Sequence, residues 1–312
     1  MNFHNLLCLV TIIACKMSRG EALSTTNNLF PNIADISRAS PLLTEFFHGY
    51  FTAKSLHNAT SWLEFFHPRQ VVYYDATMGE GFSSKSQLVP AFTELTQEWP
   101  KNATSYPLQI LGNSDSAIIH YVDTPGLFGN AEIRSISAVD FRDGKVTRQV
   151  DYWDRRRNPD DNAGPIDQYP YSLGVETVDQ KATPEIIRTA YQLNAALAAN
   201  DTDAAAILFS YDAVWIDLAL RTRQEGQLAI GRYLRRALGS LPFGPGTSVR
   251  HVLGCAQGGG YEWQAAHNST LNGITALELD DNGSITQFTT SWDGSRLNDS
   301  ALQALVTVAI ES

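Results

Sequence analysis

Cysteine is almost absent from this chain of 312 residues, which contains three cysteines in all. Cys8 and Cys15 fall within residues 1–22, so Cys255 is the single cysteine of the remaining chain. A disulfide within that remaining chain is therefore excluded, and so is a metal site built from several cysteines. Stability has to come from packed hydrophobic cores, and the chain is long enough for two domains of ordinary size.

Positive charge is also scarce. The chain has 23 Lys and Arg residues against 33 Asp and Glu residues, for a net charge of −10. An acidic chain binds polyanions poorly, so we do not expect nucleic acid as a partner. The basic run of Arg155, Arg156 and Arg157 is explained more simply as a solvated stretch after a strand.

Long hydrophobic runs are missing. The apolar run over residues 6–15 is too short to span a bilayer, and Lys16 interrupts it. Gly20 and Ala22 follow at a plausible cleavage spacing, so residues 1–22 are typical of a secretory signal peptide. We therefore expect a protein of the secretory pathway or the extracellular space, with no membrane contact after signal cleavage.

Acceptor sequences for N-glycosylation are frequent. Each has the form Asn-X-Ser/Thr without proline in the middle, as glycosylation in a eukaryotic secretory pathway requires. Their chance occurrence in a cytosolic protein is the alternative. The asparagines predicted to carry glycans are Asn58, Asn102, Asn200, Asn268, Asn282 and Asn298.

Sequence signatures of metal and nucleotide sites are absent too. His48, His57, His67 and His120 lack the close spacing of a zinc motif, and no His-Glu-x-x-His sequence occurs. There is no nucleotide-binding glycine loop and no Gly-x-Ser-x-Gly nucleophile turn. We therefore predict no metal and no cofactor, and cofactor-independent chemistry fits best.

An acid stands at the end of a predicted strand. Residues 71–75 are β-branched and aromatic, end in Asp75, and lead into a loop with two glycines. Residues 213–217 repeat the pattern and end in Asp217. We expect the two acids to be equivalent points of one repeated fold, with Asp75 as the candidate for chemistry. The alternative is a loop acid that caps nearby backbone groups.

The whole chain follows this repeat. Helical spacing dominates residues 40–100, and four strand patterns follow, with a hairpin turn at Asp143 and Gly144. Residues 183–297 show the same order, with Asn282 and Gly283 at the hairpin. We predict a signal peptide (1–22), a first domain (40–157), a linker (158–182), a second domain (183–297) and a C-terminal tail (298–312).

Three helices before a run of strands predict an α+β fold, with two tandem cone-shaped domains. In each cone, the three helices would pack on a strongly curved antiparallel sheet. Such a cone encloses an apolar pocket.

Each half resembles a nuclear transport factor 2-like domain, the group that includes SnoaL-like polyketide cyclases, ketosteroid isomerases and scytalone dehydratases. The resemblance lies in the strand that ends in an acid, the glycine-containing loop, the following helix, and a final hairpin that closes on Tyr152, Trp153 and Asp154. It covers nearly all of the chain after the signal peptide. It implies the cone fold and acid–base chemistry on a small apolar molecule.

In the ketosteroid isomerases the acid that ends the first strand is the proton-transferring base, and the resemblance places Asp75 there. A tyrosine of the first helix donates to the enolate, and the resemblance places Tyr50 there, whereas the second half has Leu193. The second enolate donor of the isomerases is a protonated acid, but this chain has Ser137 at that point. From the residues alone, Tyr50 is equally a core aromatic on an apolar helix face.

Further polar side chains are candidates for the pocket. His120 alternates with apolar neighbours on a middle strand, so it either lines the pocket and assists catalysis or faces solvent. Asp154 and Asp293 are pocket acids or ion-pair partners of Arg156 and Arg296. We expect substrate contacts from Tyr73, Ser137, Arg134, Trp153 and Asp154.

The sequence thus predicts a secreted or lumenal, cofactor-independent cyclase, isomerase or dehydratase. It would act on a small apolar, polyketide- or terpenoid-like molecule of secondary-metabolite biosynthesis, and the first half would carry the activity. The alternative is a non-catalytic module that binds apolar ligands or other proteins. We also expect the two domains to pack on each other, and further oligomerisation remains open.

Overall fold

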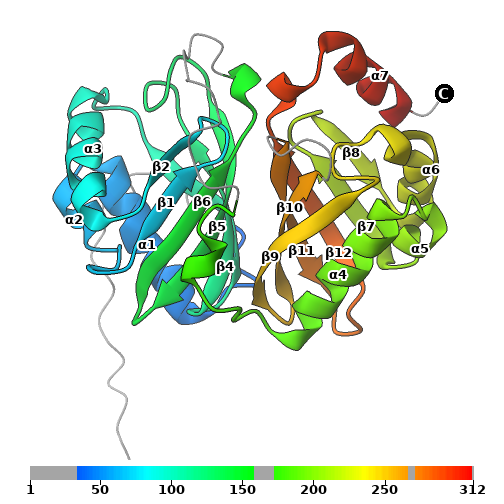
Figure 1. Cartoon of the computed structure of the whole chain (residues 1–312), viewed down its shortest axis with the longest axis horizontal. Helices are drawn as coiled ribbons and strands as arrows, with labels where there is room; N and C mark the ends of the chain where they lie inside the picture. Colours follow the sequence, from blue (N-terminus) through cyan, green and yellow to red (C-terminus); the bar gives the residue numbers. More distant parts are fainter. Residues whose placement is uncertain (1–33, 158–171, 266–270, 311–312) are drawn as a thin grey trace, which may run out of the picture.

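The computed structural model describes residues 34–157, 172–265 and 271–310. The expected signal peptide and Asn268 lie outside these ranges. The chain forms two similar α+β halves, each with a six-stranded sheet, and the two sheets lie between outer layers of helices (Figure 1). The predicted α+β fold with two tandem cones is confirmed.

The first half begins with helices and ends with strands. Its sheet has the order β2-β1-β6-β5-β4-β3. β1 runs parallel to β6, so the sheet is mixed and the expectation of an antiparallel sheet was wrong at this one pairing. The elements are α1 (Pro41–Ser55), α2 (Ala59–Leu63), β1 (Val72–Asp75), β2 (Glu80–Phe82), α3 (Lys85–Glu98), β3 (Ser105–Gly112), β4 (Ser116–Asp123), β5 (Ile133–Arg142), β6 (Lys145–Tyr152) and the 3-10 turn η1 (Arg155–Arg157).

Local signals in the sequence set the ends of these elements. Ser40 caps α1, because its side chain accepts a hydrogen bond from the Leu43 amide at 3.3 Å, and Pro41 occupies the first turn. Asp143 and Gly144 both have positive φ, at 53° and 69°, and form the tight turn between β5 and β6. This turn is the predicted hairpin.

The second half repeats the first. α4 has the same length of 15 residues as α1, and Asn200 after it has a φ of 57°, matching the φ of 55° at His57. The sheet order is β8-β7-β12-β11-β10-β9, again with one parallel pair, β7 and β12. The elements are η3 (Val175–Thr177), α4 (Pro184–Ala198), α5 (Thr202–Ala206), β7 (Phe209–Asp217), β8 (Thr222–Glu225), α6 (Gln227–Ala237), η4 (Leu238–Ser240), β9 (Thr247–Cys255), β10 (Gly258–Ala265), β11 (Asn272–Leu279), β12 (Ile285–Trp292), η5 (Gly294–Arg296) and α7 (Asp299–Ala309).

The outer faces of the two sheets pack against each other. Ile118 and Val150 of the first half share one buried cluster with Leu253 and Ile274 of the second. Arg148 lies fully buried in this interface and donates two hydrogen bonds to Glu262, at 2.9 and 2.7 Å. From Arg148 to Tyr152 on β6, therefore, the even-numbered side chains face the other half, and Gln149 and Asp151 face into the first cone.

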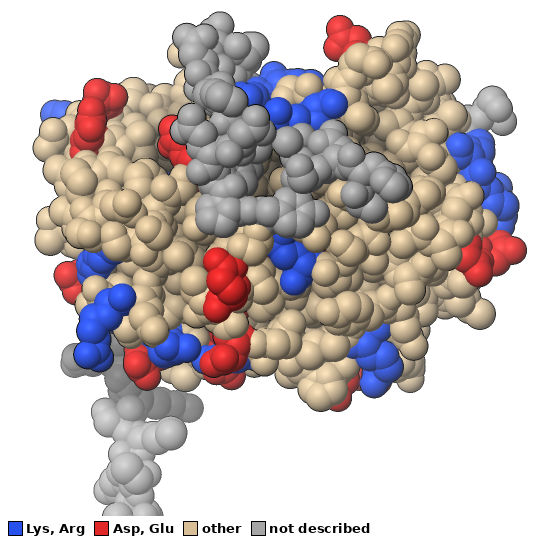
Figure 2. All heavy atoms as spheres, viewed as in Figure 1, with Lys and Arg blue, Asp and Glu red and all other residues tan. Residues whose placement is uncertain are grey.

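The C-terminal tail forms α7, whose first turn is capped by Asn298. In the described ranges, no helix combines the length and the apolar character that a membrane crossing needs. On the face seen in Figure 2, basic and acidic side chains are scattered rather than gathered by sign.

Candidate active site in the first cone

A cavity of about 270 Å³ opens inside the first cone, between the sheet and the helices. Its wall is mostly aromatic and aliphatic, and a few carboxylates and one ammonium group interrupt it. A pocket of this kind suits a small, largely apolar molecule. The lining residues are Lys54, Trp62, Tyr73, Asp75, Met78, Glu80, Phe82, Ala91, Phe92, Leu95, Tyr121, Asp123, Phe128, Ile133, Ser135, Asp151 and Trp153.

Asp75 ends β1 and turns its carboxylate to the cavity wall. The indole Nε1 of Trp153 donates to its two oxygens at 2.9 and 3.2 Å. The backbone amides of Thr77 and Met78 donate to Oδ1 at 2.9 and 2.8 Å. Burial raises the pKa of Asp75 to about 7, helped by the charge of Asp151 and opposed by these donors. A carboxyl with this pKa exchanges protons readily near neutral pH.

Asp151 is the neighbour of Asp75 across the parallel strand pair β1 and β6. Its carboxylate accepts hydrogen bonds from the Tyr73 hydroxyl at 2.5 Å, from Gln149 Nε2 at 3.0 Å, and from the hydroxyl of Ser137. Three donors thus hold the Asp151 carboxylate in place beside Asp75.

The ion pair of Lys54 and Asp123 is a second polar group of the cavity lining. Lys54 of α1 donates to Asp123 Oδ1 of β4 at 2.8 Å, and both side chains are almost fully buried. The ammonium also lies 5.6, 4.9 and 5.4 Å from the ring centroids of Trp62, Tyr121 and Phe128. Burial raises the pKa of Asp123, and Lys54 opposes this rise.

The structure does not bring Tyr50 into the cavity with Asp75. The Tyr50 ring is buried among the phenylalanines of α1, and its hydroxyl donates to Gln149 Oε1 at 3.1 Å. It borders a separate small void of about 10 Å³ deeper in the cone, which Ser137 also borders. The placement corresponds to the core aromatic that the residues alone allowed.

His120 and Arg134 lie on the outer face of the sheet. Their neighbours Tyr121, Ile133 and Ser135 line the cavity, and alternation turns the intervening side chains away. Burial lowers the pKa of His120 to about 4, and Arg134 pairs with Glu132 at 2.9 Å. Neither residue is therefore placed to touch a molecule in the cavity.

Of the remaining residues predicted to contact the substrate, two line the cavity and one forms an ion pair. Tyr73 and Trp153 line the cavity. Asp154 instead forms an ion pair with Arg156 at 2.7 Å, and Asp293 forms one with Arg296 at 3.1 Å, as the pairing alternative predicted. Sequence reasoning missed Lys54, Asp123, Tyr121 and Asp151 as parts of the cavity.

The second cone has an acid and a tryptophan that are equivalent to Asp75 and Trp153. Asp217 accepts a hydrogen bond from Trp292 Nε1 at 3.2 Å and one from the Leu220 amide at 2.9 Å. Burial raises the pKa of Asp217 to about 7. Asp75 and Asp217 are therefore equivalent: each accepts a hydrogen bond from a tryptophan indole of its own half, and burial raises the pKa of each.

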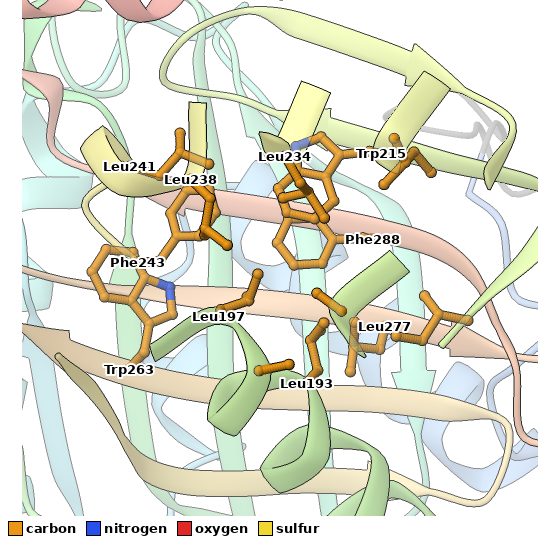
Figure 3. Packing of buried hydrophobic residues seen from close by; sticks show 14 of the residues in the cluster. Leu193, Leu197, Trp215, Leu234, Leu238, Leu241, Phe243, Trp263, Leu277 and Phe288 are labelled. Atoms are coloured by element: carbon orange, nitrogen blue, oxygen red, sulfur yellow. The ribbon is translucent and has the colours of Figure 1, made fainter. Parts of the chain in front are cut away.

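Large apolar side chains fill the interior of the second cone (Figure 3). The ring of Trp215 stacks on Phe288 with centroids 3.7 Å apart. Strand pairing shows that these two stand where the first half has Tyr73 and Gln149. The centre of the second half is therefore a packed core, and the first half is the one that presents a lined cavity to a ligand.

Metal ligation has no visible basis in the described ranges: no group of three or more His, Cys, Asp and Glu side chains is arranged to hold an ion. The chemistry that the lining residues themselves supply is proton transfer at Asp75 and hydrogen-bond donation from Lys54 and the tyrosines.

No protein-family model and no curated protein sequence matches the chain. Solved structures do. A steroid delta-isomerase from Pseudomonas aeruginosa is 18% identical, with 42% of this chain and 93% of that chain covered and a TM-score of 0.32. A protein named as a SnoaL-like polyketide cyclase, from Shewanella denitrificans, is 17% identical, with coverages of 39% and 96% and a TM-score of 0.34. An NTF2-like protein of unknown function from Cytophaga hutchinsonii is 8% identical, with coverages of 36% and 91% and a TM-score of 0.30.

Each of these matches spans less than half of this chain and nearly all of the solved one. They are nuclear transport factor 2-like, SnoaL-like and isomerase-like proteins, the group that the sequence resembles. No catalytic role follows from likenesses of this level, so the account of the site depends on its own geometry.

Proposed function

We propose that the first half of this protein is a cofactor-independent acid–base catalyst, a cyclase, isomerase or dehydratase, that acts on a small apolar metabolite. One observation carries the proposal. The carboxyl group of Asp75 lies at the wall of an apolar cavity, and its pKa is raised to about 7. At neutral pH such a group is present in both protonation states, as a general base and a general acid must be.

The proposed step uses only groups of the chain. Asp75 as carboxylate removes a proton from an activated carbon of the substrate and returns it at another position. The indole of Trp153 holds the carboxylate in place in both states. The aromatic walls exclude water, which strengthens each electrostatic contact inside. A polyketide- or terpenoid-like ring system suits this lining.

The test compares metabolites of the source organism in three strains: a deletion, Asp75→Asn, and Asp217→Asn as the matched control. We expect one product to disappear in the deletion and in Asp75→Asn, and to persist in Asp217→Asn. A product lost in the deletion but kept in Asp75→Asn would exclude Asp75 as the base and favour a binding module. A deletion with an unchanged profile would contradict the proposal as a whole.

We further propose that the protein enters the secretory pathway and is glycosylated. Support comes from exposure, because the five sequon asparagines in the described ranges, Asn58, Asn102, Asn200, Asn282 and Asn298, are all exposed. Glycosidase treatment of native material should lower its apparent mass on a gel. An unshifted band would count against both proposals.

A further inference from the structure

The buried pair of Lys54 and Asp123 is not something the fold requires. The helix caps Ser40 and Thr183 align α1 with α4 and place Leu197 where the first half has Lys54. Strand pairing aligns the ends of β4 and β10 and places Ala265 at the position of Asp123. The same fold in the same chain is thus built without the pair.

Burying two charges is unfavourable, and apolar side chains of similar volume often serve stability as well or better. Leu197 belongs to the packed core of the second cone, which shows what a purely structural residue does at this position. The ion pair stands in the half that has the lined cavity, and both of its members line that cavity. These facts point to a ligand rather than to folding.

The ammonium of Lys54 can donate more hydrogen bonds than its ion pair with Asp123 uses. It carries three N–H donors, and its one hydrogen-bonded partner within the described part of the chain is Asp123. The ring centroids of Trp62, Tyr121 and Phe128 lie 4.9–5.6 Å from it, and the side chain is almost fully buried. Donors held in this way act strongly on an oxygen that enters the cavity.

The charges of the cavity restrict the kind of oxygen. Asp75, Asp123 and Asp151 all line the cavity, and Asp123 already neutralises Lys54. A ligand that arrives as an anion is therefore disfavoured. A neutral carbonyl or phenol oxygen that gains negative charge only during the reaction is favoured, since the interaction then grows in the transition state.

We propose that Lys54, held by Asp123, is the group that binds the reacting oxygen, and that the substrate is a neutral ring compound with an enolisable carbonyl. This rests on the proposed function of Asp75. The Asp75 carboxylate takes a proton from the carbon next to the carbonyl. The electron pair of that C–H bond forms a C=C bond, and the carbonyl π pair moves to the oxygen, to which Lys54 donates. The proton then returns from Asp75 to a carbon, and no oxidant or further reactant is needed.

The probe is 2-naphthol, a neutral two-ring phenol whose fluorescence distinguishes phenol from phenolate. In the unmodified protein, bound naphthol should ionise at a pH at least one unit lower than in the double variant K54L/D123A, which carries the residues of the second cone. This difference is the shift that the ammonium of Lys54 produces. K54L/D123A should still bind naphthol, and there the bound phenol should ionise above its value in water, because the apolar wall and the carboxylates of Asp75 and Asp151 remain. K101L, which removes an exposed lysine, is the matched control and should leave the shift unchanged.

The isosteric neutral pair K54M/D123N keeps the side-chain volumes and should abolish the shift in the same way, so a folding defect in K54L/D123A leaves the test intact. A naphthol ionisation that is the same in the unmodified protein and in both double variants would overturn the assignment, and so would an unmodified protein that does not bind naphthol. Asp75→Asn separates this from the proposed function, because it should remove the metabolite while the ammonium of Lys54 still shifts the bound naphthol.

Discussion

Asp217 offers a direct test of the electrostatics, because it has the pKa shift without a lined cavity. Its side chain is fully buried, and its pKa is raised from 3.8 to about 7 in the folded protein. The folded state therefore holds a proton that the unfolded state releases as the pH rises above 4. Stability is greatest below that pH, falls as the pH rises, and has lost the full contribution above pH 7.

The magnitude follows from the shift. About three pKa units at 1.36 kcal/mol each give about 4 kcal/mol of lost stability between pH 4 and pH 8. Asp217→Asn removes this loss, because asparagine does not ionise. It also has a single acceptor oxygen for two donors, the Leu220 amide and the Trp292 indole, and an unmatched donor costs about 1–3 kcal/mol.

We therefore expect Asp217→Asn to be about 1–3 kcal/mol more stable than the unmodified protein at pH 8 and less stable at pH 4. The assay is urea unfolding followed by tryptophan fluorescence at several pH values. Asp212→Asn, at an exposed acid of the same strand, is the control and should leave the pH dependence unchanged. Stability curves of Asp217→Asn and unmodified protein that run parallel from pH 4 to pH 8 would refute the reasoning.

Three further substitutions have defined outcomes. Arg148→Met leaves Glu262 buried without its cation and should lower the free energy of unfolding by about 3–5 kcal/mol in urea; a loss below about 1 kcal/mol would contradict the interface described. Trp153→Phe removes a donor that lowers the pKa of Asp75, so a carboxyl NMR titration should show that pKa above 7, and a lower value would be inconsistent. Phe288→Ala opens the second core and should cost about 3–5 kcal/mol in the same unfolding assay, whereas a negligible cost would argue against tight packing there.

The fold is well encoded in local sequence. The cap at Ser40 and Pro41 and the hairpin at Asp143 and Gly144 are formed as their residue types predict. Local patterns do not say which strands pair, however, and the parallel pairing of β1 with β6 could not be predicted from them. That pairing decides the site, because it sets Asp151 beside Asp75.

Part of the candidate site was visible in the sequence and part was not. Leu43, Phe47, Tyr50 and Lys54 follow one another at helical spacing, so a lysine on the buried stripe of α1 was a signal that could have been recognised. The position of Tyr50 outside the cavity could not be recognised from the sequence, because helical spacing gives the face of a helix and not the distance of a side chain from the cavity. The side of the sheet on which His120 lies could not be predicted either. Alternation puts its side chain on the face opposite to those of its neighbours, but it does not say which face holds the cavity.

The central claim is that the first cone presents a carboxyl group poised for proton transfer near neutral pH. It is tested most directly by the NMR titration of the Asp75 carboxyl carbon from pH 3 to pH 9, with Asp75→Asn to assign the signal. The account predicts a midpoint near 7. A midpoint near 4, the value of an ordinary aspartate, would contradict it.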